Sequence, residues 1–387
     1  MILRLCLIAG IIQLSGCGVG DYITTFMGGE DNADPPVPLE EFDAEIEIVT
    51  LWTKSAGKGA GKQYLKLTPA ATYDHVFVAD PRGEIRAFDA TNGQLVWQLD
   101  TDAPISGGPG IGDGLVVVGT IEGQVLAVAE QEKALQWQSH VSSEVLASPR
   151  IANNVAVIRT VDGKVFGLDA GGGERLWVYE RTVPALTLRG TGTPTITDNM
   201  VIGGFASGRL VALELNSGRP IWETPIAIPS GRTELERIVD IDSEPYVIDG
   251  TVYVATFQGR IAAIDQQTGR MIWNREISSY AGIGVDEHNL YVTDDQSHVW
   301  ALDRFTGTSL WKQEKLHARA VTAPASFGDF VVVGDLEGYL HWMHKNDGRF
   351  VARNHVSDDS IIAPPIVINN ILFAYTTGGT LGAYRYQ

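Results

Sequence analysis

The sequence predicts an all-β fold, an eight-bladed β-propeller built from four-stranded antiparallel blades. Three residue types that recur in a fixed phase carry this prediction. Eight positions recur at intervals of 38 to 51 residues; seven hold glycine and one holds Ser297. A proline lies fourteen residues before each of these positions except Ser297. A tryptophan follows the first six places by fourteen residues. Repeats of about 40 residues with this composition are typical of propellers. The recurring residues are the glycines Gly83, Gly123, Gly163, Gly208, Gly259, Gly338 and Gly379, the prolines Pro69, Pro109, Pro149, Pro194, Pro245, Pro324 and Pro365, and the tryptophans Trp97, Trp137, Trp177, Trp222, Trp273 and Trp311.

The unit around Gly83 shows how each repeat is expected to form a blade. Apolar runs at 76–79 and 85–88 flank a turn at Gly83, where glycine can take the positive φ that a tight hairpin needs. A second turn at 89–93 precedes a strand that ends at Trp97, and the stretch before residue 76 supplies the remaining strand. Four antiparallel strands per unit are the sheet size of a propeller blade. We expect the tryptophans to dock between neighbouring blades and to hold the ring together rather than to form a cofactor site.

The last two units depart from the pattern. Ala352 stands in the seventh tryptophan place, and the unit around Gly379 is not followed by a tryptophan strand. The stretch 45–52 ends at Trp52, which precedes Trp97 by 45 residues, a spacing like that of the other units. We therefore expect this N-terminal strand to complete the last blade and to close the ring, which leaves only short, protected sheet edges.

The N-terminus resembles that of bacterial lipoproteins. Residues 1–16 carry one positive charge and a short apolar run, which is too short to span a bilayer and fits a signal peptide. The run ends in Leu14-Ser-Gly-Cys17, which looks like a lipobox. The resemblance implies that Cys17 is the lipid attachment site and, because Gly18 rather than Asp follows it, that the protein lies in the outer membrane at its periplasmic face. The alternative is an unmodified cysteine after a plain signal peptide.

Residues 17–44 are predicted to be an acidic, flexible tether between the lipid and a single propeller domain at 45–387. Nine acids and no Lys or Arg lie between residues 18 and 47, among paired glycines and prolines. The net charge of −18 argues against nucleic acid as a partner and against electrostatic docking to anionic lipid. The protein is therefore expected to reach the membrane through its lipid anchor.

The sequence offers no catalytic or metal site. His341 and His344 are the one close pair of histidines, and a spacing of three on a strand puts them on opposite faces. No Gly-x-Ser-x-Gly, phosphate loop or zinc spacing occurs. The stretch Ala263–Trp273 resembles the repeats of quinoprotein alcohol dehydrogenases, which implies the eight-bladed fold, but the vicinal cysteine pair and long inserted loops of those enzymes are missing. We expect no enzyme activity, no cofactor and no metal.

Two adjacent links between blades are longer than the rest and form the candidate binding patch. They lie between Trp177 and Pro194 and between Trp222 and Pro245, and such links share one face of a ring. The first carries Leu186, Leu188 and Arg189, a plausible interface anchor. The second carries a potential helical turn at 233–236, followed by Asp240 and Asp242. Two alternatives stay open: the leucines fold back onto the propeller, or the aspartates serve in local capping or pair with Arg237 or Arg189.

The whole chain resembles the BamB family, the propeller lipoproteins of the bacterial outer-membrane β-barrel assembly (BAM) machine. The most specific matches are Ala185–Gly190, Asp240–Asp242 and Gly334–Trp342. The resemblance implies a non-enzymatic scaffold that binds the periplasmic POTRA domains of BamA and assists folding and insertion of β-barrel proteins. Its partners would include other subunits of the BAM complex and unfolded outer-membrane proteins. The implied partner-binding residues are Leu186, Leu188, Arg189, Asp240 and Asp242. The alternatives are a periplasmic quinoprotein dehydrogenase-like enzyme that uses pyrroloquinoline quinone and a binding module for peptidoglycan or a polysaccharide.

Overall fold

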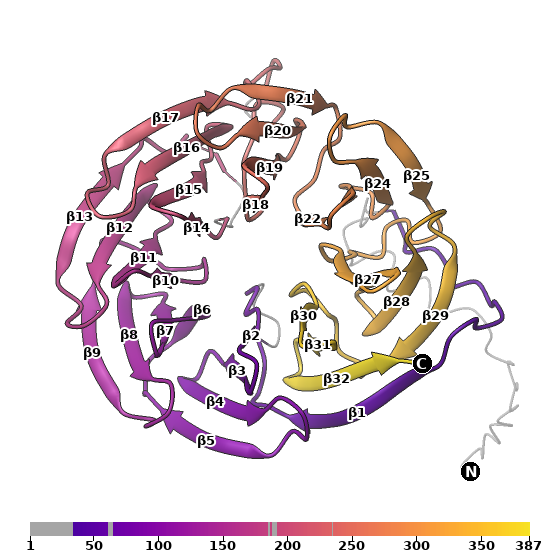
Figure 1. Cartoon of the computed structure of the whole chain (residues 1–387), viewed down its shortest axis with the longest axis horizontal. Coiled ribbons are helices and arrows are strands. Elements are labelled where there is room, and N and C mark those ends of the chain that lie inside the picture. The colour runs from indigo at the N-terminus through magenta and orange to yellow at the C-terminus, as the bar shows by residue number, and fades with distance from the viewer. Residues whose placement is uncertain (1–33, 61–64, 185, 188–191, 234) are drawn as a thin grey trace, which may run out of the picture. The chain divides into compact units, whose positions relative to one another are not determined.

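The computed structural model describes residues 34–60, 65–184, 186–187, 192–233 and 235–387. Residues 36–387 form one compact unit, in which eight four-stranded antiparallel sheets close into a ring (Figure 1). The predicted eight-bladed propeller is confirmed. In each blade the first strand lies next to the central channel and the fourth strand lies at the rim. None of the described residues forms a helix long and apolar enough to span a bilayer.

The blades are numbered 1 to 8 in chain order, and each contains four strands. Blades 1 to 4 comprise β2(Ala70–Ala71), β3(His75–Ala79), β4(Glu84–Asp89), β5(Leu95–Asp100), β6(Ile105–Gly112), β7(Leu115–Thr120), β8(Gln124–Ala129), β9(Leu135–His140), β10(Arg150–Ala152), β11(Val155–Arg159), β12(Lys164–Asp169), β13(Arg175–Glu180), β14(Thr195–Thr197), β15(Met200–Gly204), β16(Arg209–Glu214) and β17(Pro220–Pro225). Blades 5 to 7 comprise β18(Tyr246–Ile248), β19(Thr251–Ala255), β20(Ile261–Asp265), β21(Met271–Arg275), β22(Gly282–Val285), β23(Asn289–Thr293), β24(Val299–Asp303), β25(Ser309–Gln313), β26(Ala325–Phe327), β27(Phe330–Gly334), β28(Tyr339–His344) and β29(Phe350–His355). Blade 8 comprises β30(Ile366–Ile368), β31(Ile371–Tyr375), β32(Thr380–Tyr386) and β1(Ile48–Ser55).

The recurring tryptophans join neighbouring blades, as predicted. Trp137 is buried, and its indole Nε1–H donates to the backbone oxygen of Ala170 in the next blade at 2.7 Å. The same kind of bond joins Trp52 to Ala90 and Trp311 to Lys345. Each indole therefore buries its apolar ring and still satisfies its only donor, which is what a large side chain at a blade interface requires.

The N-terminal strand closes the ring, as predicted. β1 pairs antiparallel with β32, the last strand of the chain, and the register runs from Ile48 opposite Tyr386 to Ser55 opposite Thr380. Trp52 lies opposite Ala383 and packs beside Phe88 of blade 1. A glycine is required next to it, because a Cβ on Gly93 would lie 2.6 Å from the Trp52 ring. Blade 8 is thus shared by the two ends of the propeller.

Blade 7 keeps the tryptophan–alanine pair of the other blades but exchanges the two strands. In blade 6 the third strand supplies Ala301 and the fourth supplies Trp311, which lie opposite each other. In blade 7 the third strand supplies Trp342 and the fourth supplies Ala352, again as a pair. Trp342 is fully buried and donates its Nε1–H to Asn354. The exchange explains why the sequence has alanine in the seventh tryptophan place.

The end of the predicted tether is packed on the propeller. Residues 36–47, here called the strap, run outside β29 before the chain enters β1 (Figure 1). Phe42 stacks on Phe350 at 5.6 Å between ring centroids, and the Arg353 guanidinium lies over the Phe42 ring. The side chain of Leu39 packs in the core between blades 6 and 7. This differs from the expectation of a solvated segment up to residue 44, because apolar side chains at every third or fourth position give the acidic stretch a face to bury.

Ion pairs fasten the strap at both ends. Arg349 donates to both carboxylate oxygens of Glu45, at 2.9 and 2.8 Å, and this bond holds the pKa of the Glu45 carboxyl below its ordinary value. Lys315 pairs with Glu40 at 2.6 Å. Residues 36–44 of the predicted flexible tether are therefore packed on the propeller, whereas its residues 17–33 lie outside the described residues.

Phe42→Ala is expected to loosen the strap without unfolding the ring. The change removes the stacking on Phe350 and the contact with Arg353, while the blade cores do not depend on this side chain. Cleavage by a glutamate-specific protease at Glu40 and Glu41 should become at least tenfold faster, with an unchanged thermal midpoint. Asp43→Ala, a change at an exposed neighbour, is the control and should leave the cleavage rate unchanged. An unchanged rate in Phe42→Ala would show that the packing does not protect the strap.

A buried charge cluster lies beneath the strap in blade 7. The Arg319 side chain, which is buried, donates from Nε to the buried carboxylate of Asp335 at 2.8 Å and from Nη1 to the Val37 backbone oxygen at 2.9 Å. His341 Nε2 lies 2.9 Å from the same Asp335 oxygen. Asp335 thus binds both Arg319 and His341. Glu337 also pairs with Arg319, and Arg353 donates from Nε to His341 Nδ1 at 3.2 Å. His344 lies in a separate contact, edge-on to Phe330, so the predicted separation of the two histidines is confirmed.

Candidate functional site: the face of the long links

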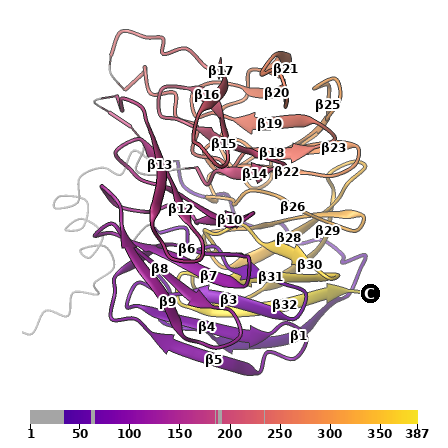
Figure 2. The same cartoon turned by 60° about the vertical axis from the view of Figure 1, so that its left-hand side comes forward.

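The two long links pack against each other, as their positions in the sequence predict. They join β13 to β14 and β17 to β18, and Figure 2 shows their described parts beyond the ends of the strands. A Cβ on Gly192 of the first link would lie 2.7 Å from the Ser243 oxygen and 3.0 Å from the Ile241 oxygen of the second. The close approach needs glycine at position 192, and it makes the two links one continuous surface.

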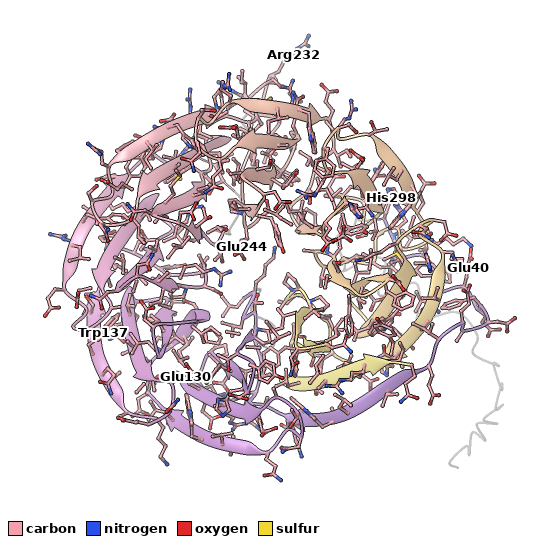
Figure 3. The ribbon with its side chains drawn as sticks, viewed as in Figure 1. Glu40, Glu130, Trp137, Arg232, Glu244 and His298 are labelled. Carbon is pink, nitrogen blue, oxygen red and sulfur yellow. The ribbon has the colours of Figure 1, made fainter. Side chains whose placement is uncertain are left out.

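Three apolar side chains on these links are exposed. Leu186 of the first link is 45 % exposed, and Ile228 and Leu235 of the second are more exposed still. Leu186 therefore does not fold back onto the propeller. Arg232 belongs to the second link and lies at the periphery of the ring in Figure 3. The sequence-predicted residues Leu188 and Arg189 lie outside the described residues.

The predicted helical turn in the second link is a single capped turn. The Glu236 backbone N–H donates to Thr233 Oγ1 at 3.2 Å, and the Glu236 carboxylate accepts from the backbone N–H groups of Thr233 at 3.4 Å and Arg232 at 2.7 Å. Such reciprocal side-chain caps satisfy backbone donors that a short turn leaves open. The turn presents Leu235 on the exterior of the loop.

The two predicted aspartates lie at the base of the second link rather than on its exterior. Asp240 is 1 % exposed, and its backbone oxygen accepts from Phe257 N–H at 2.9 Å. Ser243 donates to the Ala255 oxygen of β19 at 2.9 Å, which ties the end of the link to blade 5. Burial raises the pKa of Asp242, and the charges of Arg159 and Lys66 oppose that rise. The structure thus brings Asp242 close to the cations Arg159 and Lys66.

Arg159 is the buried cation between the two links. It ends β11, its Nη1 donates to the Gly192 oxygen at 3.1 Å, and its guanidinium lies over the Phe205 ring at 5.0 Å. Burial lowers the pKa of Arg159 to about 10, against the raising effects of Asp242 and Asp240. Arg159 therefore bonds the end of the first link while its charge offsets the aspartates of the second. Neither insertion in the sequence points to this arginine, because it belongs to the regular repeat.

Lys66 adds a third link to the same site. The stretch from Trp52 to Pro69 is as long as the one from Trp177 to Pro194 that holds the first predicted insertion. Because it precedes the first repeated glycine, the spacings between glycines do not reveal it. Lys66 Nζ donates to the Tyr280 backbone oxygen of the link between blades 5 and 6 at 3.3 Å, across the channel mouth. Burial lowers the pKa of Lys66, which the charge of Asp242 opposes. The tryptophan-to-proline distance is the sequence signal that would have found this link.

The channel contains a cavity of about 490 Å³ that lies below these links. Residues in and next to the first strands line it, among them four of the repeated prolines, and Arg150 pairs with Glu244 inside it. Figure 3 shows Glu244 near the centre of the ring. Within the described ranges, no group of three His, Cys, Asp or Glu side chains is placed to hold a metal ion.

Comparison with known proteins identifies the family. A family model described as "Outer membrane protein assembly factor BamB" matches residues 81–313. The BamB of Pseudomonas aeruginosa is 43% identical over 353 residues, which cover 91% of this chain and 93% of that protein. The chain belongs to the BamB family of outer membrane protein assembly factors. The solved structure of BamB from Moraxella catarrhalis superposes with a TM-score of 0.81 at 27% identity, covering 88% of this chain and all of that one.

A quinohemoprotein alcohol dehydrogenase from Pseudomonas putida shares the ring only. Its TM-score is 0.69 at 12% identity, over 87% of this chain and 76% of that one. A likeness at that identity shows the fold and not the chemistry, because propellers support many unrelated functions. Membership of the BamB family is the reason to consider the face of the long links as a protein-binding surface rather than as a redox site.

Proposed function

We propose that this protein is a non-enzymatic scaffold lipoprotein of the outer-membrane protein assembly machinery, bound to BamA through the face of the long links. Its anchor would be lipid on Cys17, which would hold it at the periplasmic face of the outer membrane. Membership of the BamB family supports the assembly role. The POTRA domains of BamA are the proposed contact, other BAM subunits would join the same complex, and unfolded outer-membrane proteins would be its clients.

The observation that carries the proposal is the exposed apolar surface on two packed links. Leu186, Ile228 and Leu235 project from a base that Gly192 and Ser243 hold together. Exposed apolar patches mark protein–protein interaction sites, and arginine is enriched at binding hot spots. The proposed contact residues are Leu186, Leu188 and Arg189.

Asp240 and Asp242 are assigned a supporting role in this proposal. Asp240 is buried, so it would act by holding the second link in place rather than by touching the POTRA domain. Asp242, which is partly exposed, offsets part of the charge of Arg159 and Lys66 and would keep the links in register. Both residues remain necessary for partner binding under this proposal, but through the shape of the surface.

Substitution of the contact residues tests the proposal. Leu186→Asp and Arg189→Glu should each weaken binding of purified BamA POTRA domains at least tenfold, because the first buries an unpaired charge and the second reverses one. The measurement is surface plasmon resonance with the lipid-free propeller. Leu95→Asp is the matched control, because Leu95 is about equally exposed but lies on the rim of blade 1.

Three results decide the matter. Loss of binding in both variants with retention in Leu95→Asp supports the partner and the surface together. Equal binding by all proteins would mean that BamA binds another surface. No binding by the unchanged protein would refute the POTRA contact, although membership of the family would stand.

A further inference from the structure

Every blade carries a β-bulge at the same place on its outer strand. The register of each fourth strand shifts at the residue that precedes the tryptophan position. That residue is apolar in all blades except blade 2, where it is Gln136. The apolar residues are Val96, Leu176, Ile221, Ile272, Leu310, Val351 and Leu51. A bulged residue leaves the regular ladder, so its backbone groups are available to a segment that lies along the rim.

On blade 7 the strap occupies this place. The Glu45 backbone N–H donates to the oxygen of the bulged residue Val351 at 2.8 Å. Arg349, two residues earlier, holds the Glu45 carboxylate through two bonds. Farther along, Arg353 donates to the Glu40 backbone oxygen at 3.0 Å. The contacts run in opposite order along the two segments, so the strap lies antiparallel to the outer edge of β29.

Blades 4 and 5 repeat the sequence that holds the strap. β29 begins within Gly348-Arg-Phe-Val351, β17 within Gly218-Arg-Pro-Ile221 and β21 within Gly269-Arg-Met-Ile272. The arginine thus stands two residues before the bulged residue in all three blades. No other blade has arginine or lysine in that position.

The three blades differ at two positions that contact the strap and in the exposure of the bulged residue. Phe350 and Arg353 correspond to Pro220 and Glu223 in blade 4 and to Met271 and Asn274 in blade 5. Val351 beneath the strap is 1 % exposed, whereas Ile221 is 44 % and Ile272 is 53 % exposed. The Arg219 side chain is 77 % exposed and makes a long ion pair with Glu214 at 3.6 Å. Arg270 donates from Nε to Thr268 Oγ1 at 3.3 Å. Both arginines lie on the surface, with their neighbouring isoleucines accessible.

We propose that the outer edges of β17 and β21 are docking sites for an extended acidic segment of a protein partner, held as the strap is held on β29. The arginine would bind a glutamate of the segment, and the oxygen of the bulged isoleucine would accept the backbone N–H of that glutamate. An apolar residue of the segment three positions before the glutamate, in the place of Phe42, would lie against the strand. We call these places the edge sites.

The chemistry of the edge sites selects such a partner. A carboxylate can form two bonds with a guanidinium, which adds direction as well as strength. The isoleucine oxygen needs only one backbone donor, so Pro220, which lacks an N–H, does not block the site on β17. The strap itself is not the occupant, because its attachment to β1 gives it a high effective concentration at its own β29. The edge sites are separate from the surface proposed for BamA, so either proposal can fail alone.

A peptide copied from the strap is the probe. Fluorescein-labelled Pro38–Glu47, titrated with the full chain at physiological salt, should bind saturably in fluorescence anisotropy. The double variant Arg219→Ala/Arg270→Ala should weaken binding at least tenfold, because it removes both guanidinium groups that would bind the glutamate carboxylate of the peptide. Arg82→Ala removes an exposed arginine from a turn between the second and third strands and should leave the affinity unchanged. A peptide carrying Glu45→Lys should bind at least tenfold more weakly than the original.

The position of the bound peptide separates the edge sites from exchange with the strap. A photoreactive phenylalanine in the place of Phe42 should cross-link to β17 or β21. Cross-links confined to β29 would mean that the peptide displaces the strap, and they would overturn the proposal. Affinity that is unchanged in the double variant, or an absence of saturable binding, would overturn it as well.

Discussion

Trp52→Ala is expected to lower the free energy of unfolding by about 3–5 kcal/mol, the usual cost of removing a buried aromatic side chain. The indole fills the contact between blades 8 and 1 and donates to the Ala90 oxygen, and Gly93 packs directly on its ring. Removing it leaves a cavity at the one blade that two distant parts of the chain build together. Equilibrium urea unfolding, followed by tryptophan fluorescence and circular dichroism, measures the change.

Leu310→Ala is the control for this measurement. Leu310 stands on an outer strand, as Trp52 does, but its side chain is half exposed and closes no ring. We expect its substitution to change the free energy of unfolding by less than about 1 kcal/mol. An equally small change for Trp52→Ala would mean that β1 contributes little to closure, contrary to its pairing with β32.

Asp335→Ala is expected to cost about 3–5 kcal/mol, because it leaves the buried Arg319 cation without its buried counter-charge. Burial by itself would raise the pKa of Asp335, but the bond from His341 and the charge of Arg319 hold that pKa below its ordinary value. Burial also lowers the pKa of His341, against the effect of Asp335. Asp347→Ala, which removes an exposed carboxylate from Arg349, is the control and should cost about 1 kcal/mol or less.

The same cluster predicts a direction for the effect of pH. Both folded-state pKa values lie below those of the unfolded chain, which are about 6.5 for histidine and about 3.9 for aspartate. The unfolded chain therefore binds more protons, and acid favours unfolding. The contribution of His341 should be lost as pH falls below about 6.5, and that of Asp335 as pH falls below about 4. In His341→Gln, the urea midpoint should fall less than in the unchanged protein between pH 7.5 and 5.5. Parallel curves would show that His341 does not titrate on unfolding.

The regular part of the molecule could be predicted from its repeats. Gly83, Trp97 and their counterparts have the same local task in each blade, so their spacing was sufficient to predict the strands and the closure by Trp52. Ala352 marks where spacing alone fails. The partner that compensates for it is Trp342 on the neighbouring strand, a relation that exists only once the strands are paired.

The candidate site was predicted in its location but not in its inner structure. Long links predicted the surface that exposes Leu186, whereas the burial of Asp240 depends on how the second link folds back onto blade 5. Arg159 reaches the site from a regular position at the end of β11, which no insertion marks, and Lys66 reaches it from the long stretch between Trp52 and Pro69, which precedes the first repeated glycine. The packing of the strap could not be predicted for a similar reason. Its acidic composition is typical of a solvated segment, and the arginines of blade 7 that bind it are far away in the sequence.

The strap also determines how the ring responds to pulling. A tension applied at Pro36 meets the bond of Val37 with Arg319, the ion pair of Glu40 and the contacts of Phe42 and Glu45 in chain order. The force reaches β1, whose bonds to β32 would otherwise open one after another from Ile48, only after these contacts have yielded. The strap thus protects the pairing of β1 with β32, which closes the ring, from mechanical load on the N-terminal segment.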